Sequence, residues 1–300
     1  MSFKINSLYL TKATELSHKA MLPPGTTKIY RTYIPGNLNN AFKDTTKIVS
    51  FGQQLAWKWL HDEFEENFFY TEERENNKIK HSEFPIYGDG LNLKLKKKAL
   101  QFAKDMSLYL GMEYDGKHFE ELWDLGYLPI RVKILSEGSQ TNGNIPHMTL
   151  INTNDDFAWL PSYLEKIVLP LIMKSSYAAT ISKLYRKQAE KWVNKTDNKN
   201  TDLVDFMCID SATKDSSNLW DMIATGLGFA TSFKNSNNLS VIPASRYFYG
   251  VKEDEMPIFS VNASEHSCSC TKIFAEAEKY SQVEEQFNEA TQQWETVRYF

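Results

Sequence analysis

The residues best suited to chemistry lie in one short segment near the end of the chain, residues 258–270 (IFSVNASEHSCSC). β-forming residues lead into small ones and then into Glu265 and His266, so the segment predicts a strand that ends at a histidine. Proteins built from parallel β/α units place acid–base and nucleophilic groups at such strand ends. His266, Cys268 and Cys270 are also possible metal ligands, but the sequence has no second Cys/His pair at ligand spacing, so we predict no metal site.

The second half of the chain has to position these residues, and its pattern alternates strands with helices. A long helical stretch over residues 157–193 is expected to break at Pro170, and residues 218–228 form a shorter helix. Strand–helix–strand order of this kind indicates parallel β/α units. The strand-like segments are residues 203–210 (LVDFMCID), 228–235 (GFATSFKN) and 256–264 (MPIFSVNAS).

The first half predicts a mixed domain. Apolar residues at helical spacing predict a helix within residues 48–64 and an amphipathic helix over residues 91–111 that stops at Gly111. The expected strands are residues 28–34, 126–138 and 147–154.

The last thirty residues, 271–300, place apolar side chains at steps of three and four. This spacing predicts one amphipathic helix of six or seven turns, whose apolar stripe must be buried against something. The stripe consists of Ile273, Ala277, Tyr280, Val283, Phe287, Ala290, Trp294 and Val297.

Composition sets limits on the class of protein. The 300 residues are 42% hydrophobic and 24% charged, as in a folded protein with a sizeable core. A net charge of −4 gives no reason to expect nucleic-acid or membrane-surface binding. No apolar run approaches 18 residues, and three cysteines do not make a disulfide framework. We therefore expect a cytoplasmic protein with reduced thiols.

Seven motifs, in order and at matching spacing, resemble the nicotinamide phosphoribosyltransferase family. The resemblance implies an α+β domain packed on a (β/α) barrel, similar to type II phosphoribosyltransferases, working as a homodimer. It also implies transfer of ribose 5-phosphate from phosphoribosyl pyrophosphate to nicotinamide, with Mg²⁺ and ATP. The motifs are LSHKAMLPPGTTKIY (16–30), VSFGQQL (49–55), GYLPIRVKILSEG (126–138), HMTLINTND (147–155), WLPSYLEKIVL (159–169), LVDF (203–206) and SVNASEHS (260–267).

Family members are longer, and the resemblance ends where a barrel would be half built. We therefore expect an α+β N-terminal domain over residues 1–155 and an incomplete parallel β/α half-barrel over residues 156–270. A half-barrel exposes an unpaired strand edge, which must be covered. The long C-terminal helix over residues 271–300, or another chain, is expected to cover it.

The resemblance assigns candidate site residues. Phe206 matches the aromatic residue on which the family stacks the pyridine ring, and His266 matches the histidine that the family phosphorylates to couple ATP hydrolysis to transfer. Asp205 and Glu265, their neighbours in the matching motifs, are further substrate-binding candidates. A core phenylalanine and a strand-end histidine with no catalytic role are the alternatives for Phe206 and His266.

Other family positions have lost their chemistry. Val204 stands for a histidine, Ile209 for a phosphate-binding arginine, and Asn237 for the aspartate that reads the nicotinamide amide. The Asp-Ser-Tyr whose tyrosine reaches across the dimer is replaced by residues 12–14 (Lys-Ala-Thr), and a further arginine by Gly36. Because isoleucine offers no hydrogen-bond donor, these changes predict an inactive enzyme that keeps the framework.

Three functions follow as alternatives. The first is an inactive relative retained for a binding or structural role, which requires no cofactor. The second is one half of a split, active transferase, and the third is a regulator that binds nicotinamide or a nucleotide. We expect a homo-oligomer or a place in a larger assembly. The Asn- and Lys-rich composition is reminiscent of AT-rich phage genomes, where relatives of this family also occur.

Overall fold

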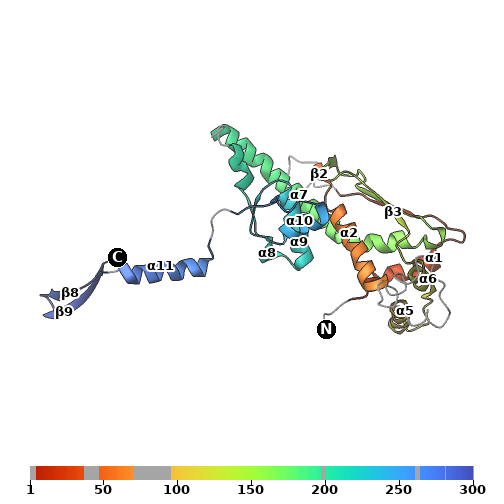
Figure 1. Ribbon diagram of the computed structural model, residues 1–300, viewed down its shortest axis with the longest axis horizontal. Coiled ribbons are helices and arrows are strands. Elements are labelled where there is room, and N and C mark those ends of the chain that lie inside the picture. The colour runs from red at the N-terminus through yellow and green to blue at the C-terminus, as the bar shows by residue number, and fades with distance from the viewer. Residues whose placement is uncertain are drawn as a thin grey trace. The chain divides into compact units, whose positions relative to one another are not determined.

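The computed structural model describes residues 5–36, 47–69, 96–196, 201–260, 264–280 and 282–299. The chain divides into two compact units, Met1–Phe259 and Ser260–Phe300, which are described separately here (Figure 1). The boundary predicted near residue 155 falls inside the first unit, where it stays a prediction. No helix among the described residues has the length and apolar character needed to cross a membrane.

The first unit is a mixture of helices with small sheets, as expected for an α+β fold. Its main sheet is antiparallel, in the order β1 (Tyr30–Tyr33), β5 (Met148–Asn152), β3 (Ile130–Ile134), and it confirms the three strands expected in the first half. Alternate residues of β5 are buried, which is the period-2 pattern of a strand with one face on the core. A second antiparallel pair joins β2 (Lys47–Val49) to β4 (Gln140–Asn142).

Helix α7 (Leu160–Thr196) is the longest element, and it contacts β1, β2 and β5 as well as the helices α2 and α9 (Figure 1). The break expected at Pro170 is wrong, because the helix continues through it. Proline removes one backbone hydrogen bond and crowds the preceding turn. Pro170 lies on the exposed side of α7, where water can hydrate the carbonyl left without a partner.

Two helices predicted from periodicity are confirmed. α2 (Gln53–Phe64) buries Leu55 and Leu60, and α5 (Lys97–Leu110) ends at Gly111, which adopts a left-handed φ of 67°. Only glycine takes that conformation without steric cost, so it terminates the helix. The remaining short elements before α7 are η1 (Ser7–Leu10), η2 (Ala13–Ser17), α1 (His18–Met21), η3 (Glu65–Phe69), α6 (Lys117–Leu125) and η4 (Asp155–Phe157).

The last part of the first unit contains less strand than expected. Residues 203–206 belong to η5 (Thr201–Phe206), and residues 228–230 end α9 (Leu219–Ala230), so the strands predicted there are wrong over those residues. α9 extends this far because Gly228 lets it approach α7 closely; a Cβ at Gly228 would lie 2.5 Å from the Ser175 carbonyl oxygen. Two short helices complete this part, α8 (Ala212–Asp215) and α10 (Val241–Tyr249).

The second unit corrects the single long helix predicted for residues 271–300. α11 spans His266–Tyr280, and an antiparallel hairpin follows, with β8 (Gln282–Asn288) paired to β9 (Gln293–Tyr299). β-branched and aromatic residues are frequent in β8 and β9 and favour strands. The register pairs Phe287 with Trp294. The apolar steps of three and four therefore predict the helix correctly as far as Tyr280, and over residues 282–299 they match a helix only by coincidence of spacing.

Candidate functional site

The sequence places the candidate chemistry at the carboxyl ends of parallel strands, and three short parallel segments do meet in the first unit. β6 (Ile209–Asp210) pairs with β7 (Asn235–Ser236), and Asn235 forms a parallel bridge with Phe259. The Ser236 N–H donates to the Phe259 carbonyl at 2.9 Å. This junction follows α7, with α8 and α9 between β6 and β7 in the chain, which is the connection that parallel strands require.

Asp205 forms ion pairs with two cationic side chains, Arg186 and Lys234. Its carboxylate accepts from Arg186 of α7 at 2.5 Å and pairs with Lys234 at 2.7 Å. Hydrogen bonding from Lys234 and then from Arg186 lowers the pKa of Asp205. Arg186 also donates to the Ser232 carbonyl, at 2.9 Å. The group therefore ties η5 and the segment before β7 to α7, and both cations engage the Asp205 carboxylate.

Phe206 lies at the end of η5 and is half-buried, with its ring centre 6.4 Å from that of Phe259. The position that the resemblance gives to a phosphate-binding arginine, Ile209, is 44% exposed and apolar. Asn237, at the aspartate position, is exposed just beyond β7. Position 209 thus presents an aliphatic side chain where phosphate recognition would need a cation.

Asp210 is a polar strand-end residue that our reading of the sequence missed. It is buried at the carboxyl end of β6 and accepts hydrogen bonds from the Ser236 hydroxyl at 3.0 Å and from the Ala212 N–H at 2.9 Å. Gly226 of α9 closes over it, since a Cβ there would lie 3.0 Å from Asp210 Oδ2 and 2.4 Å from Asn238 Nδ2. The sequence signal that could have identified Asp210 is an aspartate at the end of an apolar strand. The carboxylate stabilises the junction internally.

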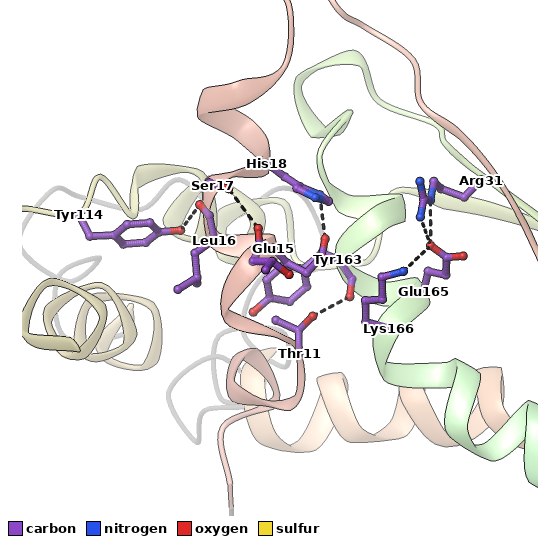
Figure 2. Close-up of polar contacts among 11 residues, drawn as sticks. Thr11, Glu15, Leu16, Ser17, His18, Arg31, Tyr114, Tyr163, Glu165 and Lys166 are labelled. Carbon is purple, nitrogen blue, oxygen red and sulfur yellow. Dashed lines mark hydrogen bonds and ion pairs between the residues drawn. The ribbon is translucent and has the colours of Figure 1, made fainter. Parts of the chain in front are cut away.

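The segment that replaces the family's Asp-Ser-Tyr makes polar contacts with α7, with the loop before α6 and within itself (Figure 2). Thr11 donates to the Tyr163 carbonyl at 3.1 Å, and the Tyr114 hydroxyl donates to the Leu16 carbonyl at 3.0 Å. His18 pairs with the buried Glu15 at 2.8 Å. Residues 12–14 are themselves exposed, and none of them is aromatic. The segment keeps its place in the fold without a side chain that stacks on a ring.

Glu265 and His266 lie in the second unit, whereas Asp205 and Phe206 lie in the first. The expectation that His266 ends a strand is wrong, because it is the first residue of α11. Glu265 caps this helix, accepting from the Cys268 N–H at 3.0 Å and from the Ser267 hydroxyl. These bonds, that of Ser267 first, lower the pKa of Glu265 to about 2. A carboxylate used as a cap is committed to the helix start.

His266 faces a thiol. Its Nε2 lies 3.6 Å from Sγ of Cys270, one helical turn further along α11. Among the described residues, no three or more His, Cys, Asp or Glu side chains of one chain are grouped as metal ligands.

Comparisons with known proteins confirm the resemblance. The nicotinamide phosphoribosyltransferase of Acinetobacter baylyi is 30% identical over 276 residues, which cover 90% of this chain and 50% of that protein. The nicotinamide phosphoribosyltransferase of Xanthomonas campestris is 24% identical over 208 residues, which cover 67% of this chain and 43% of that protein. The chain thus spans about half the length of the curated relatives it matches. No protein-family model matches it.

Proposed function

We propose that this chain, a relative of the nicotinamide phosphoribosyltransferases over nine tenths of its length, serves NAD salvage by binding and does not itself transfer phosphoribosyl groups. The transfer passes through an oxocarbenium-like state while pyrophosphate leaves, so the site must supply cations and correctly placed carboxylates. Arginines would hold the phosphate oxygens, and carboxylates would hold Mg²⁺ through water.

The observation that carries the proposal is that the polar groups at the strand junction already have partners within the chain. Asp205 is bound by Arg186 and Lys234, and Asp210 is buried by α9. Ile209 presents only carbon where a donor is needed. Losing one electrostatic group from a comparable site costs about 10²- to 10³-fold in rate, so several losses together remove a practical activity.

The test is a product assay on the whole chain. Nicotinamide, phosphoribosyl pyrophosphate, Mg²⁺ and ATP are incubated with the purified protein, and nicotinamide mononucleotide is measured. The A. baylyi relative provides the positive control. We expect no product above the protein-free rate. Product that disappears in His266→Ala would overturn the proposal.

A split enzyme is the second candidate, since the matched part of the relatives amounts to half their length. Its test adds the remaining half of the A. baylyi sequence as a second chain. Activity that needs both chains would favour the split enzyme over the binding role.

A nicotinamide-binding regulator is the specific form of binding role that Phe206 favours. Calorimetry with nicotinamide separates it from a structural role. Micromolar binding that Phe206→Ala abolishes would assign the regulator, whereas the absence of heat would leave a structural role.

A further inference from the structure

The first turn of α11 carries two metal-ligating side chains on one face. His266 and Cys270 are four residues apart, so they lie one above the other along the helix. Nε2 of His266 is 3.6 Å from Sγ of Cys270. The thiol is free, and His266 is exposed.

This separation fits two ligands of one tetrahedral zinc ion. With Zn–N bonds of about 2.0–2.1 Å and a Zn–S bond of about 2.3 Å, a tetrahedral angle sets nitrogen and sulfur about 3.5–3.6 Å apart. The distance between the two atoms is therefore that expected of a zinc chelate. A thiol–imidazole hydrogen bond has a similar length, and the experiment below separates the two.

The described residues of one chain bring two of these ligands together. Structural zinc sites have four protein ligands, and the described residues of one chain contain no such group of three or more. Glu265 is committed to the helix start. Cys268 is two residues from both His266 and Cys270, which places it on another face of the helix.

The same face of α11 continues as an apolar stripe. Ile273, Phe274 and Ala277 follow His266 at seven, eight and eleven residues, the spacing of one helical face. Ile273 is 63% and Phe274 is 74% exposed. A second α11 packed in parallel along this stripe would bury both residues and bring its own His266 and Cys270 opposite the first pair. An antiparallel partner that overlaps the whole 15-residue helix would put the centres of the two pairs about 15 Å apart, near opposite ends.

We propose that two copies of this chain bind one Zn²⁺ through His266 and Cys270 of each, with their α11 helices paired in parallel. Both thiols bind as thiolates, so binding one ion releases two protons from the two cysteines. The site holds the ion with four ligands and is structural, and it is independent of the proposed function.

The experiment titrates the reduced, metal-free full chain with Zn²⁺ against a chromophoric chelator. We expect one ion for every two chains. His266→Ala and Cys270→Ser should each weaken binding by more than the roughly 10- to 100-fold that loss of a supporting residue costs. Cys268→Ser is the matched control, since it removes a neighbouring thiol and should bind like the parent. Co²⁺ in place of zinc should give the intense visible bands of a tetrahedral thiolate site.

The outcome that overturns the proposal is one ion per chain, or binding that survives Cys270→Ser. One ion per chain would refute the shared site, and binding that survives Cys270→Ser would reduce the 3.6 Å contact to a hydrogen bond. Phe274→Glu tests the pairing separately, because it keeps both ligands while it charges the stripe. Light scattering should show that the zinc concentration needed to associate Phe274→Glu chains rises at least about tenfold, as expected for loss of a central interface residue. Unchanged association would refute the parallel helix pair.

Discussion

α7 and α11 both carry an apolar stripe, but the two stripes differ in how far they are buried. In α7, apolar residues spaced mostly four apart are buried. The helix contacts strands of two sheets (β1 and β5, and β2) and the helices α2 and α9 of the same unit. In α11, Ile273 and Phe274 remain largely exposed. The periodicity of apolar residues therefore predicts which face of a helix will be buried. It does not identify the element that buries that face. The α7 residues concerned are Leu160, Leu164, Val168, Ile172 and Ala179.

The polar groups of the two regions differ in the same way. Asp205 at the strand junction pairs with cations, and Asp210 accepts hydrogen bonds within the first unit. In the second unit, Nε2 of His266 lies 3.6 Å from Sγ of Cys270. On the proposed inactive role, a chain that keeps its framework is expected to use its polar residues to hold elements together, as Asp205 does between η5 and α7. A new binding site would then form at polar side chains that are not already paired within the fold.

The largest expected effect is a loss of stability when a buried residue next to α7 is truncated. Trp159 is 2% exposed and packs edge-on against Phe119 and Tyr163. Trp159→Ala should lower the free energy of unfolding by about 3–5 kcal/mol, through lost transfer energy and a cavity. Urea unfolding followed by far-UV circular dichroism measures it. Phe274→Ala in α11, at low protein concentration and without zinc, is the control and should change it by less than about 0.5 kcal/mol. Equal losses would mean that α11 is part of the core.

The next effect is a pH dependence from His118. Burial, and then the charge of Lys19, lowers the pKa of His118 from 6.5 to about 4. The unfolded chain therefore binds this proton more readily. The stability conferred by the neutral ring is present in full above about pH 6.5 and is lost as the pH falls through about 4, with up to about 3 kcal/mol at stake.

The measurement is the difference between wild type and His118→Gln in the free energy of unfolding from pH 7.5 to pH 4. The variant should show a shallower slope over this window. Some slope should remain, because burial lowers the pKa of His147 as well. Parallel profiles would contradict the assignment of His118 as a buried neutral ring.

The sequence predicted the first unit well where local signals and tertiary packing agreed. Alternation gave β1, β3 and β5, and a glycine at the right place gave the end of α5. It was wrong at residues 203–206, which lie in η5, and at 228–230, where close packing of α9 on α7 extends the helix. Such packing depends on residues far apart in sequence, here Gly228 and Ser175, which no local pattern connects.

The candidate site was predicted less completely. Ordered motifs named Asp205, Phe206 and Glu265 as candidates, but they did not show that a lysine and an arginine pair with Asp205 or that Glu265 caps a helix. His266 and Cys270 lie on one face of α11 because they are four residues apart in a helix. We did not predict this contact, because we expected a strand that ends at His266. The C-terminal hairpin was missed because apolar residues at steps of three and four satisfied the helix pattern.

A smaller effect tests the close contact that made α9 a helix to Ala230. A methyl group at Gly228 would lie 2.5 Å from the Ser175 carbonyl oxygen and 2.8 Å from Ala178 Cβ. Gly228→Ala should therefore destabilise the fold by about 1–3 kcal/mol, the usual cost of overpacking, although alanine favours helices. Thermal unfolding measures the loss. Gly36→Ala is the control, since nothing lies within 4 Å of a Cβ there. A stabilised Gly228→Ala would show that α7 and α9 can move apart freely.

The smallest effect concerns Glu265 and decides whether it is a cap or a ligand-binding group. Glu265→Ala removes the acceptor of the Cys268 N–H, so this amide should exchange with solvent faster while the unfolding of the first unit is unchanged. Amide exchange followed by NMR measures it, with Glu276→Ala, an exposed residue of the same helix, as control. Since hydrogen bonding lowers the pKa of Glu265 from 4.5 to about 2, the cap should persist above about pH 4.5 and be lost as the pH falls through about 2. A Cys268 amide that exchanges at the same rate in both variants would remove the cap and return Glu265 to the substrate-binding candidates.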